Sequence, residues 1–117
     1  MAEDLGEFLN QLKAAGELLG IEEELEITFE IPAAIREIDK RVGKAAFFPR
    51  VKGYTIPIVA NLLGQKKRLA LALGVEEGGL IEEYLRRRKN PVKPTIVANG
   101  PVKQVIINKG ISILKTI

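Results

Sequence analysis

The sequence of 117 residues contains neither cysteine nor histidine. Without cysteine, the chain cannot form disulfides, thiolate nucleophiles, iron–sulfur clusters or thiolate zinc sites. Without histidine, it lacks the commonest general base, the side chain that titrates near neutral pH and the usual ligand of transition metals. Catalysis by this chain alone would have to rest on Asp, Glu, Lys, Ser, Thr or Tyr, which argues against an independent enzyme.

Aromatic residues and long apolar runs are also scarce. Aromatics make up 5% of the sequence, and no apolar run approaches the roughly 20 residues that span a bilayer. Met1 is followed by the acidic segment Ala2-Glu3-Asp4, where a secretory signal would carry positive charge. We therefore expect a cytoplasmic protein without a membrane span.

The composition is that of an ordinary globular protein, with 46% hydrophobic and 28% charged residues. A chain of this length fits one domain and buries roughly two thirds of the surface that its unfolded form exposes. We expect residues 1–117 to form a single domain.

Charge is distributed unevenly along the chain, although the formal net charge is only +3. Residues 1–30 hold nine carboxylates and the single cation Lys13, whereas residues 84–117 hold eight cations and no acidic side chain. Two interpretations stay open: the two ends pair in the fold or form solvated faces, or one end binds a charged partner.

Four segments have the pattern of helices. Asp4 and Glu7 are spaced like a capping box, and Gly16 offers a stop. Pro32 suits the first turn of a helix whose apolar face includes Val42. The predicted helices span roughly 5–15, 32–42, 65–73 and 80–89.

Several segments have the pattern of strands, which together with the helices predicts an α/β domain with a mixed sheet. Residues 25–31 alternate apolar and polar side chains at the period of a half-buried strand. Ile58 and Val59 lie in an apolar strand, and we expect them to share one core with Leu69. The remaining expected strands are residues 18–21, 56–60, 95–98 and 102–107, with a turn at 108–110 leading into 111–114.

Three charged or glycine-rich motifs are candidate binding sites. The segment 74–79 lacks phosphate-loop spacing and carries two adjacent carboxylates, and the acidic run 22–26 cannot converge on a metal if it is a strand. The run Arg86-Arg87-Arg88-Lys89, with Tyr84 nearby, could bind nucleic acid. The alternative is a helix C-terminus at which cations favour the helix dipole.

Three blocks of the sequence resemble a known family. They are VKGYTIPIVANLLGQKKRLALALG at 51–74, LGEFLNQLKAAGELLGI at 5–21 and PVKQVIINKGISIL at 101–114. In this order they resemble the N-terminal domain of the UbiD-type decarboxylases, the prenylated-flavin enzymes that include polyprenyl-hydroxybenzoate decarboxylase. The resemblance covers nearly the whole chain, but it consists mostly of packing and turn residues.

The resemblance implies an α/β N-terminal domain that precedes a central domain binding prenylated FMN and a C-terminal domain involved in oligomerisation. The family's catalytic, metal-binding and phosphate-binding residues lie in the central domain, downstream of where this sequence ends. The resemblance therefore assigns no catalytic, cofactor-binding or metal-binding residue here. The segments 109–112 and 115–117 also differ from the acidic lead-out usual in the family, so we expect the central and C-terminal domains to be absent.

The leading hypothesis is a non-catalytic N-terminal module or subunit of a UbiD-type decarboxylase that docks onto a catalytic partner. The alternatives are a stand-alone homo-oligomeric binding or structural protein and, less favoured, a nucleic-acid-binding protein that uses the basic run. The candidate interaction residues are Tyr54, Asn61, Arg86, Arg87, Arg88 and Lys89.

Overall fold

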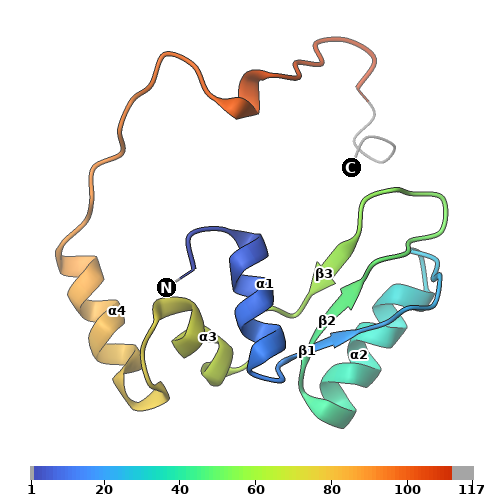
Figure 1. Cartoon of the computed structure of the whole chain (residues 1–117), viewed down its shortest axis with the longest axis horizontal. Helices are drawn as coiled ribbons and strands as arrows, with labels where there is room; N and C mark the ends of the chain where they lie inside the picture. The colour runs from blue at the N-terminus through green and yellow to red at the C-terminus, as the bar shows by residue number, and fades with distance from the viewer. Residues whose placement is uncertain (1, 112–117) are drawn as a thin grey trace.

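The computed structural model describes residues 2–111, which form an α/β body followed by an extended arm, residues 91–111 (Figure 1). Over this range the body contains four α-helices and one three-stranded sheet. The elements are α1 (Leu5–Ala14), β1 (Leu18–Gly20), α2 (Glu30–Val42), β2 (Ala45–Phe48), β3 (Ile58–Ala60), α3 (Lys66–Leu73) and α4 (Leu80–Lys89), with short 3-10 turns η1 (Glu77–Gly79) and η2 (Pro101–Lys103).

The sheet is mixed, as the sequence predicts. β1 pairs in parallel with β2, with Leu18 opposite Ala45, and β2 pairs antiparallel with β3, with Phe47 opposite Val59. A parallel pair needs a crossover between its strands, and α2 lies in that crossover. The central position of β2 places the sheet's best-buried side chains on this strand.

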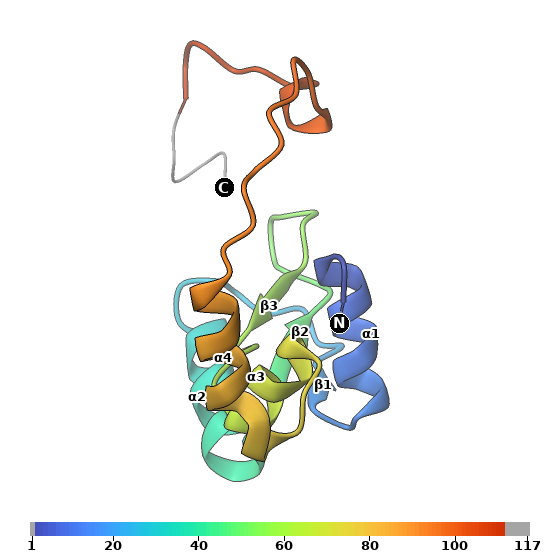
Figure 2. The ribbon, with the colours of Figure 1, turned by 90° about the vertical axis from the view of Figure 1, so that its left-hand side faces the viewer.

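Helices cover both faces of the sheet, and β2 explains why. Successive strand residues point to opposite faces, so Ala45 packs with Leu12 of α1, whereas Ala46 and Phe48 pack with Ile38 of α2. Figure 2 shows α1 and α2 on opposite sides of the strands. The body therefore has two small cores, one on each face of the sheet.

The first helix begins and ends as the sequence predicts. Asp4 Oδ1 accepts a hydrogen bond of 2.8 Å from the backbone N–H of Glu7. Glu7 Oε2 accepts one of 2.7 Å from the N–H of Glu3, the residue before the cap, so the two acidic side chains bond backbone N–H groups around the N-terminus of α1. Gly16 follows the helix with a positive φ of 70°, which ends the helix.

The prediction of a strand at 25–31 is wrong. Glu30 Oε2 accepts a hydrogen bond of 2.7 Å from the N–H of Glu26, and the N–H of Ile31 donates to the Glu26 carbonyl at 3.0 Å. These local bonds close a turn, so α2 begins at Glu30, two residues before Pro32. Leu25 makes only an isolated bridge to Val51. Among residues 2–111 the alternating pattern has no neighbouring strand to pair with.

The predicted strands at 95–98 and 102–107 are also wrong. Both segments lie in the arm, where every residue except Gly100 is exposed and the short turn η2 is the only regular element. β-Branched residues favour strands because they pack on a pleated, half-buried surface. The described chain supplies no such surface to the arm. The predicted turn at 108–110 coincides with bends at Lys109 and Gly110, and most of the segment 111–114 lies outside the described residues.

The prediction that Ile58, Val59 and Leu69 share one core is wrong, because Ile58 alone packs against the core on the α2 face and neither core includes Val59 or Leu69. Ile58, Val59 and Leu69 are half-buried rather than fully buried, and Val42 is exposed at the end of α2. On α3 the fully buried positions are Arg68 and Ala70. The buried side of α3 therefore includes a charged side chain that the sequence analysis did not place there.

A search of the described helices finds none long and apolar enough to cross a membrane.

We predict that Leu12→Ala lowers the free energy of unfolding by about 2–5 kcal/mol, because Leu12 is 0% exposed and its truncation leaves a cavity between α1 and β2. Leu5→Ala, at a position of the same helix that is 54% exposed, is the matched control. It should change stability by less than about 1 kcal/mol. Urea unfolding measures both, and equal losses would contradict the assignment of this core.

Candidate interaction surface

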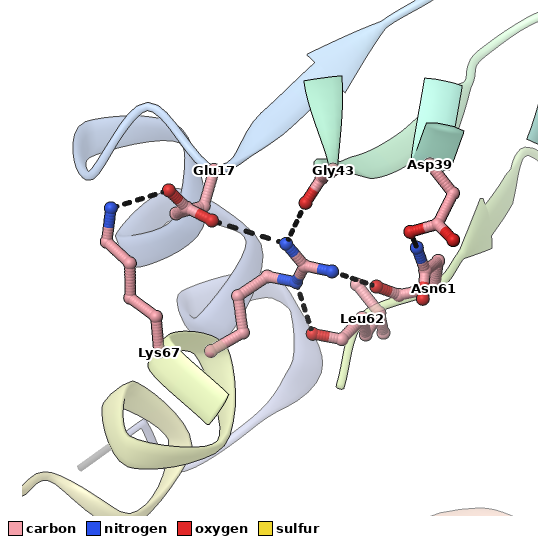
Figure 3. A network of polar contacts seen from close by, with 7 residues as sticks. Glu17, Asp39, Gly43, Asn61, Leu62 and Lys67 are labelled. Carbon is pink, nitrogen blue, oxygen red and sulfur yellow. Dashed lines mark hydrogen bonds and ion pairs between the residues drawn. The ribbon is translucent and has the colours of Figure 1, made fainter. Parts of the chain in front are cut away.

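Arg68, which lies in α3, is the polar centre of the body. Figure 3 draws the surrounding network, with Glu17, Gly43, Asn61 and Leu62 among the labelled residues. The side chain of Arg68 is 0% exposed. Nε donates to the Leu62 carbonyl at 3.1 Å, Nη2 to the Asn61 carbonyl at 3.1 Å and Nη1 to the Gly43 carbonyl at 2.7 Å. One guanidinium therefore joins α3 to the C-terminal end of α2 and to the chain that leaves β3.

Glu17 supplies the opposite charge. Its Oε2 lies 3.2 Å from Arg68 Nη1, and its Oε1 lies 2.7 Å from Lys67 Nζ. The hydrogen bond from Lys67 holds the pKa of Glu17 below its usual value; desolvation opposes this shift and the bond from Arg68 adds to it. The carboxylate is therefore ionised at neutral pH, as a buried guanidinium requires.

Asn61, one of the predicted interaction residues, belongs to the same network. It has a positive φ of 57°, and its Nδ2 donates to Asp39 Oδ1 at 2.8 Å. Its side chain also lies against Gly64, where any Cβ would overlap the Asn61 amide. Asn61 thus ties the end of β3 to α2, and Gly64 is the residue that allows this close approach.

Tyr54 lies at an apolar hollow beside β3. The hollow has a volume of about 450 Å³. Exposed residues of the lining include Ile56 (69% exposed) and Tyr54 (42% exposed). The lining residues are Ile27, Val51, Tyr54, Ile56, Pro57, Ile58 and Val59. Exposed apolar surface of this kind is typical of interaction sites.

The four predicted cations occupy the last turn of α4. Arg86 Nη2 and Arg87 Nε each lie 2.6 Å from Glu83 Oε1, and Arg87 Nη2 donates to the Leu73 carbonyl at 2.7 Å. The side chains of Arg88 and Lys89 are exposed. Part of the basic run is thus engaged within its own helix and with α3, which favours the helix-terminus interpretation.

The structure does not bring the predicted interaction residues together. Tyr54 lies at the hollow beside β3, Asn61 lies in the Arg68 network, and the basic run lies on α4 at the opposite end of the body (Figure 1). The arm continues from α4 and stands away from the body in both views (Figures 1 and 2). The largest exposed apolar residues of the arm are Val92, Ile96, Val97, Val102, Val105, Ile106, Ile107 and Ile111.

Sequence reasoning missed Arg68. One signal could have found it: Arg68 lies three and four residues before Leu71 and Ala72, on the face of α3 that packs against the core beside α1. An arginine on an apolar helix face indicates a buried ion pair, because a buried guanidinium needs a partner. The identity of that partner, Glu17, could not be read from a separation of 51 residues.

The hollow does not fit a flavin nucleotide or a metal ion. Its lining has no Lys or Arg side chain to pair with a phosphate, and none of its residues is a metal ligand of the usual kinds. Between residues 2 and 111, no group of three or more His, Cys, Asp or Glu side chains is arranged to hold a metal. The chemistry of the hollow favours apolar side chains as its occupant.

Residues 9–88 match the family described as the 3-octaprenyl-4-hydroxybenzoate carboxy-lyase N-terminal domain. The chain is 34% identical to the phenolic acid decarboxylase of Sedimentibacter hydroxybenzoicus, in a match that covers 96% of this chain and 25% of that protein. It is also 40% identical to an uncharacterised protein of Archaeoglobus fulgidus, over 71% of this chain and 17% of that protein.

Solved structures give the same result. HmfF, a UbiD-class enzyme of Pelotomaculum thermopropionicum solved as an evolved dimeric form with prFMN, is 33% identical with a TM-score of 0.85. That match covers 99% of this chain and 27% of HmfF. The closed form of the vanillic acid decarboxylase of Sedimentibacter hydroxybenzoicus is 31% identical with a TM-score of 0.78, over 97% of this chain and 26% of that one. The chain thus spans about a quarter of the length of these relatives.

We predict that Arg68→Met lowers the free energy of unfolding by about 3–5 kcal/mol, because it leaves three carbonyl groups without their donor and removes one of the two cations that bond Glu17. Arg68→Lys should also destabilise the fold, since an ammonium group cannot reproduce the guanidinium fork. Lys66→Met, at an exposed position of the same helix, is the control. A loss no larger in Arg68→Met than in Lys66→Met, measured by urea unfolding, would refute the role of this network.

We predict that the Glu83 carboxyl titrates far below its usual range. Hydrogen bonds from Arg86 and then Arg87 lower the pKa of Glu83 from 4.5 to about 2. Because the folded-state value is depressed, the stabilisation is present above the unfolded-state pKa near 4.3 and is lost as the pH falls toward 2. Carbon-13 NMR of the carboxyl group measures the midpoint. Arg86→Gln should raise it, Arg88→Gln should leave it unchanged, and an identical midpoint in all three proteins would contradict the assignment.

Proposed function

The chain belongs to the family of 3-octaprenyl-4-hydroxybenzoate carboxy-lyase N-terminal domains, and on that premise we propose that it is a non-catalytic module of a UbiD-class decarboxylase. In this proposal the module docks onto a separate subunit that carries the catalytic part. Its role is to cover and shape the surface of that subunit, and the decarboxylation takes place in the partner.

The arm is the observation that carries the proposal. The match to HmfF covers 99% of this chain with a TM-score of 0.85, so it includes the arm as well as the body. In this chain the arm's side chains are exposed from residue 91 to residue 99 and from 101 to 111. An extended apolar segment holds a single conformation only if another surface packs against it and offsets the lost conformational entropy. In this proposal the remaining three quarters of a UbiD-class enzyme supply the surface that packs against the arm.

The relatives' cofactor belongs to the catalytic partner in this proposal. HmfF has been solved with prFMN and with FMN, and a prenylated flavin would supply the decarboxylation chemistry when bound to that partner. The described residues of this chain offer an apolar hollow and an apolar arm, which suit protein–protein contact rather than a phosphate-bearing ligand.

A homo-oligomeric protein is the second candidate function, and the exposed hollow beside β3 favours it, because a second copy could cover this surface. Nucleic-acid binding through the basic run is less well supported. Glu83 neutralises part of the charge of Arg86 and Arg87, and the remaining cations share the molecule with an acidic N-terminal segment.

We predict that the chain, tagged at its N-terminus, co-purifies from the native lysate of its source with a UbiD-class protein identified by mass spectrometry. The complex should show a flavin absorbance spectrum that the chain purified alone lacks. A double variant, Val102→Asp with Ile106→Asp, should reduce recovery, because it places charges on apolar residues of the arm that are 89% and 68% exposed.

The control for this experiment is Ile81→Asp, at a position on α4 that is 73% exposed. It should leave recovery of the partner unchanged. Recovery of the chain without any UbiD-class protein, or a flavin spectrum from the chain alone, would overturn the proposed function.

A further inference from the structure

We propose that two copies of this chain exchange arms, so that the arm of one copy lies across the apolar hollow of the other. This pairing goes beyond docking to a catalytic subunit and concerns the chain on its own. It rests on the chemistry of two described surfaces, the hollow and the arm, each of which is exposed in the structure.

The hollow has an apolar lining, and the chain segment that leads into it is acidic. Ile27 is part of its lining, and Leu25 pairs with Val51, another lining residue. The segment 22–26 therefore runs beside the hollow, and it carries four carboxylates. Arg50, whose guanidinium donates to the Glu22 carbonyl, and Lys52 are the cations of the adjoining segment. These two neighbouring segments together carry more carboxylates than cations, which favours an apolar occupant with cationic side chains.

The arm has that chemistry. Its eight large apolar residues are β-branched and exposed, from Ile107 at 51% to Ile96 at 96%. Its charged residues are Lys93, Lys103 and Lys109, and it contains no carboxylate side chain. Opposite charges across a contact guide its orientation, while the apolar contact supplies most of the affinity.

The edge of the sheet could also bind the arm through backbone hydrogen bonds. Ile58 and Val59 line the hollow and belong to β3, which lies at the edge of the three-stranded sheet. An extended segment that lies in the hollow runs alongside this edge and can add to it as a strand. The arm contains the two β-branched segments, 95–98 and 102–107, that the sequence predicts as strands. Arm exchange would give them the neighbour that they lack in a single copy.

The start of the arm directs it away from its own body. Pro91 and Pro94 follow α4 directly, and proline restricts both itself and the preceding residue to extended conformations. From Asn90 the arm can reach about 50 Å by Ile106, at about 3.3 Å per residue. That reach is sufficient to cross to a neighbouring molecule. A reciprocal exchange uses both arms and both hollows and closes as a twofold dimer.

Arm exchange has a consequence for the proposed docking. The same arm cannot occupy a second copy and a catalytic subunit at once, so the homodimer is the form of the free chain and competes with the complex. Exchange also hides the apolar arm when the catalytic subunit is absent.

Cross-linking tests the exchange directly, because the chain contains no cysteine. Single-cysteine variants of the arm, Val102→Cys, Val105→Cys and Ile106→Cys, are each mixed with Ile56→Cys and oxidised. At least one mixture should give a disulfide-linked heterodimer in excess of either homodimer. Ile81→Cys, on α4 and 73% exposed, replaces Ile56→Cys as the control and should give no excess.

A matching protein with both cysteines in one chain separates exchange from folding back. If exchange occurs, it forms linked dimers. Linked monomers would show that the arm fills its own hollow, and the absence of any linkage between arm and hollow would show that they do not meet. Either result would overturn the proposal.

The association constant gives an independent measure. Sedimentation should show a dimer whose dissociation constant rises at least about tenfold in Ile56→Asp, because a carboxylate then enters an apolar contact. Ile56 is 69% exposed in the single copy, so circular dichroism should show an unchanged fold. Ile81→Asp is the control. A wild-type chain that stays monomeric, or an Ile56→Asp variant that dimerises as tightly as wild type, would overturn the proposal.

Discussion

The body of this protein depends on one buried guanidinium. Arg68 joins three backbone carbonyls from two parts of the chain, and Glu17 balances its charge. A buried charge is stable only when its partners are all in place. The C-terminal end of α2, the chain after β3 and the segment between α1 and β1 must therefore assemble together around α3. Asn61 and Gly64 belong to the same constraint, since the turn that presents the Asn61 carbonyl to Arg68 requires their close approach.

The assembled body contrasts with the arm. The body buries apolar side chains on both faces of a short sheet and satisfies its buried polar groups internally. The arm has β-branched side chains of the kind that fill cores, yet they are exposed along its described length. In both proposals this division makes the body the support and the arm the binding element. Its partner is the catalytic subunit in the proposed function and a second copy in the proposed dimer.

Membership of the UbiD N-terminal family gives this division its context. The relatives are about four times as long as the matched region. The match to HmfF covers 99% of this chain and therefore includes the arm. The hollow beside β3 lacks the cationic groups that a flavin phosphate would require. In the proposed function the module acts as a contact surface, in which apolar area supplies affinity and the uneven distribution of charge orients the partner.

The sequence by itself determined the family and the positions of the four helices, and the helices depend on local signals. The cap at Asp4, Pro32 in the first turn of α2 and the glycines at helix ends act within a few residues of the chain. Only the tertiary structure decided which segments became strands and which charges became buried. Residues 25–31 and the arm have strand-like patterns but no neighbouring strand, and Arg68 meets Glu17 across 51 positions of sequence. Strand pairing and ion pairing both depend on a partner distant in sequence, which local periodicity does not specify.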